Sequence, residues 1–346
     1  MNKTKKLILG YDYDDLVNEL KYLPDTRHYN IKQIYQWIYK KHVNDFKLMT
    51  DLPNELRTKL NDKYTLTLAP PEQVSLAQDG TKKYLFKFDN DKYVETTVIK
   101  EDKRTTVCLS SQSGCKYGCK FCATGKMGFH GDLSTGEILW QLLAIDEIDK
   151  FTNIVFMGMG EPLDNAESVF KVIKLLIDPN GWGLSNQRLT LSTIGIPDML
   201  IHCIEKTKIN IAWSLHSPFD DERHQLMPVQ NIYPLQTIID ILYEYKYYFS
   251  PHRKLTIEYL MLKDINISKA HADALAKIAN LINARVNLIP YNPHLHNEFL
   301  TPNYNEMINF QEKLKNKGVI TTIRKSKGNE ILAACGNLYT NKKKIH

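Results

Sequence analysis

The sequence predicts an α/β fold in three parts: a small helical domain, a β-hairpin connection and a larger core of alternating strands and helices. Residues 1–70 carry apolar side chains at helical spacing, and residues 71–100 alternate between apolar and polar side chains. After residue 100, short β runs alternate with amphipathic helical stretches. Repeated β–α units predict a parallel sheet with helices outside it, either open or closed as a barrel.

The N-terminal part is predicted to be helical because of its apolar periodicity. Ile31, Ile34 and Ile38 share one helix face with Tyr35, and residues 50–53 (TDLP) are typical of a helix start. Pro70-Pro71 then breaks the chain, so we place the end of this domain at residue 70.

The next segment is predicted to be a hairpin connection. Asp79-Gly80 is a turn signal, and Tyr84, Phe86 and Phe88 alternate with residues of other types. A second β run, Tyr93–Ile99, follows.

The core is expected over residues 101–335, with a lysine-rich tail over residues 336–346. The expected strands are Thr106–Ser110, Asn153–Met157, Arg188–Ser192, Asn210–Leu215, Leu255–Met261, Arg285–Pro290 and Val319–Arg324. The helices expected between them include Ser134–Ile148, Ala166–Leu176 and Ala270–Ile282. In such folds the site gathers at the carboxyl ends of the strands.

Composition bounds the class of protein. Of 346 residues, 43% are hydrophobic and 24% are charged, and the net charge of +6 permits a nucleic-acid partner without demonstrating one. No stretch approaches the roughly 20 apolar residues of a membrane helix, and the start is unlike a signal peptide. We therefore expect a cytoplasmic protein that has no membrane partner and whose six cysteines serve as metal ligands or catalytic groups before disulfides.

Three of these cysteines are clustered. Cys115, Cys119 and Cys122 are spaced C-x3-C-x2-C directly after a predicted strand. Structural zinc needs four ligands, usually in two pairs, and only His130 is near enough to be considered. Three thiolates on a four-iron cube leave one iron open for a substrate, so a [4Fe-4S] cluster is the favoured interpretation. The alternatives are zinc, or unrelated thiols that lie close together.

This spacing, with aromatic Phe121 just before the last cysteine, resembles the radical S-adenosylmethionine superfamily. The resemblance implies a partial (βα)6 barrel. It also implies that the open iron binds the amino and carboxylate groups of S-adenosylmethionine, whose one-electron cleavage releases a 5′-deoxyadenosyl radical.

Further segments narrow the resemblance to the RlmN subfamily of the RlmN/Cfr family, the bacterial adenine-C2 methyltransferases of ribosomal and transfer RNA. The segments, in order, are SSQSGC, FCATG, MGMGEPLDN, LSTIGI, SLHSP, RHQLMP, VNLIPYN and AACG. The resemblance implies two molecules of S-adenosylmethionine per turnover. The implied partners are 23S rRNA, at its peptidyl-transferase region, the anticodon loop of tRNA, and an electron donor such as flavodoxin or ferredoxin. We expect a monomer.

The resemblance also implies three catalytic residues. Carbon 2 of adenine is electron-poor, so a radical route replaces nucleophilic attack. Cys335 would carry the S-methylcysteine intermediate, Cys108 would resolve it through a transient disulfide, and Glu95 would accept the proton from carbon 2. From the residues alone, these two thiols could be core cysteines and Glu95 could lie on a solvated strand face. Cys203 has no motif around it and is interpreted as a core residue.

The cofactor residues are carried over in the same way, each at or just beyond the carboxyl end of a predicted strand. They are Gly160, Glu161, Ser192, Ser214, Leu215, His216 and Asn292. The ordinary alternatives are turn or capping roles for the serines and a structural role for His216.

RNA contact is expected from the N-terminal helices, where lysines and aromatic residues are mixed. The residues are Tyr35, Trp37, Tyr39, Lys40 and Lys41. The nearest alternative function is Cfr-type methylation of adenine carbon 8, against which the Asp-Gly-Thr turn and Gly-Glu-Pro argue. A non-catalytic metal-cluster protein that binds RNA is the alternative from another class.

Overall fold

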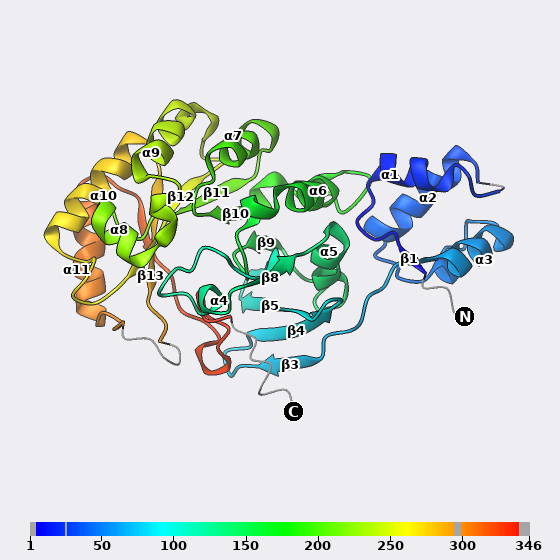
Figure 1. The fold of residues 1–346 in the computed structure, drawn as a ribbon, viewed down its shortest axis with the longest axis horizontal. Coiled ribbons are helices and arrows are strands. Elements are labelled where there is room, and N and C mark those ends of the chain that lie inside the picture. The colour runs from blue at the N-terminus through cyan, green and yellow to red at the C-terminus, as the bar shows by residue number, and fades with distance from the viewer. Residues whose placement is uncertain (1–4, 25, 294–298, 339–346) are drawn as a thin grey trace.

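Seven parallel strands form the centre of the protein in a computed structural model that describes residues 5–24, 26–293 and 299–338 (Figure 1). They are β6 (Arg104–Cys108), β9 (Asn153–Phe156), β10 (Leu189–Thr193), β11 (Asn210–Ser214), β12 (Leu255–Met261), β13 (Arg285–Pro290) and β14 (Thr321–Ile323). They lie side by side in chain order, so each crossover connects neighbouring strands. Every strand predicted in the core is present, with its ends shifted by at most a few residues.

Helices connect these strands along the outside of the sheet (Figure 1). They are α5 (Thr135–Leu143), α6 (Ala166–Ile177), α7 (Pro197–Lys206), α8 (Asp220–Leu226), α9 (Leu235–Glu244), α10 (Lys269–Leu281) and α11 (Tyr304–Lys315). Six β–α crossovers and a last strand therefore confirm the expected partial barrel.

The helix predicted over Ser134–Ile148 is shorter than expected. Ser134 is its N-cap, but α5 ends at Leu143. The following turns carry Glu147 into a buried position, where it accepts a hydrogen bond from Tyr84 at 2.7 Å and pairs with Lys82 at 2.9 Å. These partners lie far away in sequence, which is why helical periodicity could not predict the early end.

The predicted hairpin is confirmed and is an extension of the same sheet. Strands β3 (Gln73–Leu76), β4 (Lys82–Phe88) and β5 (Lys92–Glu101) continue it antiparallel beyond β6. Thr97 of β5 pairs with Cys108 of β6. The hairpin thus brings its own side chains next to the first strand of the barrel.

The N-terminal domain is helical, as predicted, and its helices α1 (Tyr13–Leu20), α2 (His28–Tyr39) and α3 (Asn54–Lys63) lie beside α5 and α6 (Figure 1). A short parallel pair of β1 (Lys6–Leu7) with β2 (Tyr64–Thr65) was not predicted. The buried apolar residues of these helices and of the barrel form one continuous core.

Two of the aromatic residues predicted to contact RNA hold these helices in place instead. Tyr39 is 0% exposed, and its hydroxyl donates to Tyr11 O at 2.8 Å. Tyr35 is 2% exposed and donates to the Asp178 carboxylate at 2.6 Å. The prediction of RNA contact is therefore wrong for these two side chains, because the helix face that carries them packs inward.

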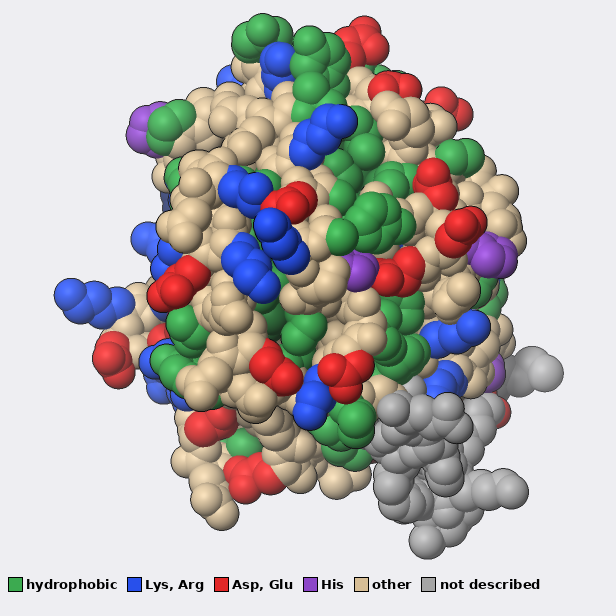
Figure 2. Space-filling model, turned by 90° about the vertical axis from the view of Figure 1, so that its left-hand side faces the viewer, with side chains coloured by type: hydrophobic (Ala, Val, Ile, Leu, Met, Phe, Trp, Pro, Cys, Tyr) green, Lys and Arg blue, Asp and Glu red, His purple; other side chains and the backbone are tan. Residues whose placement is uncertain are grey.

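The outer face over the C-terminal helices carries interspersed basic, acidic and hydrophobic side chains (Figure 2). Its charges are mixed in sign, so this face does not show the single basic stripe that nucleic acid favours. Among the described residues, no helix is both long and apolar enough to cross a membrane.

Candidate active site

A cavity of about 660 Å³ extends through the inside of the partial barrel to the carboxyl ends of its strands. The predicted site residues on its wall are Cys108, Cys115, Cys119, Cys122, Gly160, Glu161, Ser192, Ser214, His216, Asn292 and Cys335. Two predicted residues are not on this wall. Leu215 packs into the hydrophobic core, and Glu95 lies beside the cavity.

The three clustered cysteines lie on the cluster loop, residues 115–128, between the short strands β7 (Gln112–Gly114) and β8 (Phe129–Asp132). The Cys115 N–H donates to Gly128 O at 2.9 Å and closes the loop at its base. A Cβ atom on Gly114, which has a φ of +72°, would lie 1.8 Å from Gly128 O. Only glycine therefore permits this closure.

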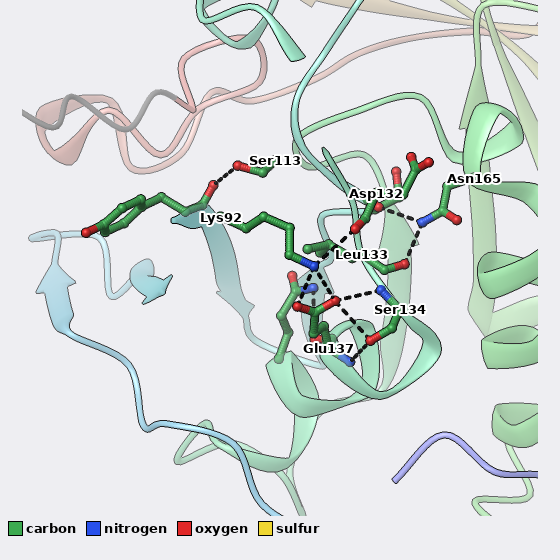
Figure 3. A network of polar contacts seen from close by, with 10 residues as sticks. Lys92, Ser113, Asp132, Leu133, Ser134, Glu137 and Asn165 are labelled. Atoms are coloured by element: carbon green, nitrogen blue, oxygen red, sulfur yellow. Dashed lines mark hydrogen bonds and ion pairs between the residues drawn. The ribbon is translucent and has the colours of Figure 1, made fainter. Parts of the chain in front are cut away.

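The base of the cluster loop is fixed by a polar network drawn from β5, α5 and the start of α6 (Figure 3). Lys92 of β5 pairs with Glu137 at 2.6 Å and donates to Asp132 O at 3.2 Å. Glu137 also completes the N-terminal cap of α5 with Ser134. Asn165 donates to the carbonyls of Ser111 and Leu133 at 2.8 and 2.7 Å. These contacts thus hold β7 and β8, the two strands that flank the cluster loop.

The thiols of the cluster loop are buried, which disfavours their charged form. Burial raises the pKa of Cys115 to about 12 and raises the pKa values of Cys119 and Cys122. Thiolate ligation would release these protons. Among the described residues, no three Cys, His, Asp or Glu side chains stand close enough together to hold a single metal ion, which the zinc alternative would require.

The cluster loop is tied to the strand end that carries Gly160 and Glu161. The Glu161 N–H donates to the Gln112 side chain at 2.9 Å, and a Cβ on Gly160 would lie 2.5 Å from the Gln112 Cβ. The Glu161 carboxylate accepts from the N–H groups of Leu163 and Ile194 at 3.1 and 3.0 Å. Burial raises the pKa of Glu161 to about 7, so its charge depends on pH near neutrality.

The remaining predicted cofactor residues lie at the next strand ends. The hydroxyls of Ser192 and Ser214 are 3.4 Å apart. His216, which follows β11, has a φ of +58°, and its Nδ1 accepts from Leu260 N–H at 3.0 Å. Burial lowers the pKa of His216 to about 3, so the ring is neutral and carries its proton on Nε2.

Cys335 reaches the cavity on a separate stretch, the Cys335 segment (residues 324–338). Gly328 and Leu332 of this segment both have left-handed backbone, with φ of +66° and +52°. The Ala123 N–H donates to Gly336 O at 2.7 Å, which places the segment against the cluster loop. All six cysteines are free, so Cys108 and Cys335 are not joined in this structure.

Comparison with known proteins agrees with this geometry. Residues 109–276 match the model of the radical SAM superfamily, and residues 8–66 match that of the ribosomal RNA large subunit methyltransferase N-terminal domain. A probable dual-specificity RNA methyltransferase RlmN of Parabacteroides distasonis is 42% identical over 91% of each chain. The dual-specificity RNA methyltransferase RlmN of Nautilia profundicola is 40% identical over 96% of this chain and 98% of its own.

The chain belongs to the RlmN family. A crystal structure of a radical SAM methyltransferase from Sphaerobacter thermophilus superposes with a TM-score of 0.90 at 34% identity, over 96% of this chain and 99% of that one. Membership of the radical SAM superfamily implies a [4Fe-4S] cluster and S-adenosylmethionine. The three thiols on one wall of the cavity provide soft ligands that fit such a cluster.

The predicted proton acceptor of the RlmN mechanism, Glu95, lies in β5 on the same strand face as Thr97 and Ile99, which line the cavity. Its carboxylate is largely buried and pairs with Lys83 at 2.8 Å. Lys83 also donates to Leu332 O at 3.4 Å. Glu95 is therefore fixed at the edge of the cavity, next to the Cys335 segment.

Among the polar residues of the RlmN cavity that sequence reasoning missed are Glu258, Asn287 and Arg324. Asn287 donates to the Glu258 carboxylate at 2.8 Å, and negative charge on Cys335 raises the pKa of Arg324. Arg324 ends a predicted strand, so the rule of strand carboxyl ends could have identified it. Glu258 lies inside a strand among apolar residues, where no comparable signal exists.

Proposed function

We propose that this protein methylates carbon 2 of an adenosine in 23S rRNA and of an adenosine in the anticodon loop of tRNA. The observation that carries the proposal is the convergence of two kinds of thiol. Cys108 and Cys335 face the same cavity as the three cysteines of the cluster loop, in a chain of the RlmN family. A passive metal-cluster protein would not need the two additional thiols.

The cofactor residues have separate tasks in this proposal. Cys115, Cys119 and Cys122 hold one [4Fe-4S] cluster, while Gly160, Glu161, Ser192, Ser214 and His216 with Asn292 surround S-adenosylmethionine. Leu215 contributes only through its backbone, since its side chain is in the core. When bound, the two cofactors supply a 5′-deoxyadenosyl radical that removes a hydrogen atom from a methyl group.

Cys335 accepts that methyl group from a first molecule of S-adenosylmethionine and presents it to the cavity. A second molecule would be needed to supply the radical, which gives two per turnover. The carbon on Cys335 then forms the new bond to carbon 2 of the base. Two observations support this role: the segment lies against the cluster loop through Gly336, and Cys335 lines the same cavity as the three cysteines of that loop.

Glu95 and Cys108 complete the reaction. The Glu95 carboxylate, held beside Lys83, accepts the proton that carbon 2 loses. Cys108 would then attack the sulfur of Cys335, so that a disulfide forms and the sulfur–carbon bond breaks with its electron pair on the methylene carbon. The proton released by the Cys108 thiol completes the methyl group, and the unpaired electron of the adduct passes to a one-electron acceptor, which the bound cluster would supply. A reductant must restore both thiols before the next turnover.

RNA reaches this cavity with its target base unpaired or flipped out, because carbon 2 is inaccessible in a duplex. The curated relatives are named as dual-specificity RNA methyltransferases. Lys40 and Lys41 remain candidates for phosphate contact because both are exposed, and Lys41 lies 3.3 Å from the ring of Trp37. The same proposal includes domain boundaries at residues 70, 100 and 335. It also includes a monomeric state and an electron donor such as flavodoxin or ferredoxin.

Nucleoside mass spectrometry tests this function directly. Ribosomal and transfer RNA would be digested from cells with and without the gene, and 2-methyladenosine and 8-methyladenosine quantified. We expect 2-methyladenosine in both RNA classes only when the gene is present. Appearance of 8-methyladenosine instead would assign the Cfr-type reaction. Absence of both products would contradict a methyltransferase role.

A further inference from the structure

Arg223 is a charged side chain inside the protein that the proposed reaction leaves unexplained. It lies in the middle of α8, is 0% exposed, and is among the largest completely buried side chains of the chain. A buried guanidinium is costly unless an opposite charge or a full set of hydrogen bonds compensates for lost hydration.

The hydrogen bonds of Arg223 are incomplete. Its Nη1 donates to the Gln230 side-chain oxygen at 2.5 Å, and its Nη2 donates to Ile194 O at 3.3 Å. Neither acceptor is a carboxylate. Among the residues that the structure describes, Nε has no hydrogen-bond partner. The carboxylate of Asp220 is one step removed, because it accepts from the Gln230 amide at 2.6 Å.

The cluster loop lies directly against this helix. The Lys120 N–H, between two cluster cysteines, donates to Leu226 O at 3.0 Å. Leu226 and Met227 belong to a small hydrophobic group against which Cys115, Cys119 and Cys122 pack. Ile194, whose carbonyl accepts from Arg223, belongs to the same group.

The cluster loop, which lies against α8, can supply a negative charge that compensates Arg223. Burial lowers the pKa of Arg223 to about 10, and Cys119, when it is a thiolate ligand, opposes this more than Asp220 does. His216, on which the charge of Arg223 also acts, is neutral. The guanidinium is thus a fixed positive charge in a low-dielectric region next to Cys119, where charges interact far more strongly than in water.

We propose that Arg223 is the buried counter-charge of the iron–sulfur cluster and that its guanidinium raises the reduction potential of that cluster. The inference rests on the proposed function, because it requires a cluster on Cys115, Cys119 and Cys122. Reduction adds one electron from a one-electron donor, with no bond formed or broken and no proton moved. Arg223 stabilises the added negative charge. The reduced cluster is therefore stabilised more than the oxidised cluster, which raises the reduction potential.

A redox titration of the full-length protein, reconstituted with iron and sulfide without oxygen and reduced stepwise with titanium(III) citrate, tests this. Electron paramagnetic resonance would measure the reduced cluster. At the potential where the wild-type cluster is half reduced, we expect Arg223→Gln to lower the ratio of reduced to oxidised cluster by about tenfold or more, a shift of about 59 mV for one electron. Arg223→Lys keeps the charge and should remain within about threefold of wild type.

A second variant moves the negative charge without removing the arginine. Asp220→Asn combined with Gln230→Glu keeps the net charge constant but places a carboxylate directly on the Arg223 guanidinium. We expect this variant to shift the potential in the same direction as Arg223→Gln. If Arg223→Gln fails to fold or to bind iron, this double variant still tests the effect of Arg223 on the cluster potential, because an arginine–glutamate pair preserves the packing.

Arg253 offers a matched control. It is also buried, at 8% exposure, and donates to the carbonyls of Ile209 and Cys203 at 3.1 and 3.4 Å, away from the cluster loop. Arg253→Gln should reduce stability but leave the potential unchanged. A wild-type potential in the charge-shifted double variant would overturn the inference. Failure of the wild-type protein to bind a four-iron cluster would instead contradict the proposed function.

Discussion

The cluster loop and the Cys335 segment bring thiols to the same cavity, but they are held very differently. The cluster loop is closed at Gly114 and Gly128 and fixed by the Lys92–Glu137 network (Figure 3). The Cys335 segment has left-handed turns at Gly328 and Leu332 and is held by separate hydrogen bonds, from Gly328 N–H to Asp79 and from Lys83 to Leu332 O. A thiol that holds a resident cofactor needs a fixed position. In the proposed mechanism the Cys335 thiol meets a methyl donor, a base and then Cys108, which requires a segment that can move.

Removing the thiol of the Cys335 segment should have the largest effect. Cys335→Ala leaves the cluster loop intact, so we expect normal iron and sulfide content but no methyl transfer to RNA. Iron analysis and nucleoside mass spectrometry measure the two results. Cys203→Ala, a core thiol, is the control and should retain turnover. Methylation by Cys335→Ala would show that the segment supplies no essential thiol.

Breaking the Lys92–Glu137 ion pair at the base of the cluster loop should lower both stability and cluster content. Lys92→Met removes the partner of Glu137 and leaves a largely buried carboxylate unpaired, which costs about 3 kcal/mol. Urea unfolding would measure the loss of stability, and iron analysis the loss of cluster. Lys87→Met, which breaks the exposed pair with Asp91, should change both by little. Equal effects of the two variants would contradict the bracing role.

Glu161, which is tied to the base of the cluster loop through Gln112, predicts a pH dependence of cofactor binding. The pKa of Glu161 is raised to about 7 by burial, so its carboxylate is ionised above pH 7 and increasingly protonated below it. In the proposed site, the ionised form accepts a stronger, charge-assisted hydrogen bond from the amine of S-adenosylmethionine than the protonated form does. We expect affinity to fall by about tenfold per pH unit below 7, measured by equilibrium dialysis. Glu161→Gln should bind weakly at every pH, and a slope that persists in this variant would assign the titration to another group.

Loosening the Cys335 segment should have the smallest effect. The Asp79 carboxylate accepts from the Gly328 N–H at 3.0 Å, and losing that bond costs about 1 kcal/mol. Asp79→Ala should lower turnover by a few-fold without changing iron content, as measured by single-turnover assays. The exposed Asp89→Ala is the control. Loss of the cluster in Asp79→Ala would show that the position of the Cys335 segment affects the cluster loop.

The barrel was predictable because its signals are local. Each strand has its own β run, and residues such as Ser192 and His216 lie at or just beyond the strand ends, where parallel sheets form their sites. The role of Tyr35 was only half predictable. Its place on the apolar helix face was correct, but that placement also excludes the RNA contact expected of it.

Arg223, Lys83 and the early end of α5 could not be predicted because they depend on tertiary contacts. The charge of Arg223 matters only because α8 packs against the cluster loop. Lys83 becomes a partner of Glu95 only through the register of β4 against β5. Glu147 ends α5 through partners on two strands that are distant in sequence.

The central claim is that the methyl carbon passes through Cys335 on its way to carbon 2 of adenine. Tandem mass spectrometry of the peptide that contains Cys335, from cluster-loaded enzyme incubated with isotopically labelled S-adenosylmethionine, tests it most directly. We predict a labelled methyl group on Cys335 before RNA is added, and its label in 2-methyladenosine afterwards. Formation of labelled 2-methyladenosine while Cys335 stays unmodified would contradict the account.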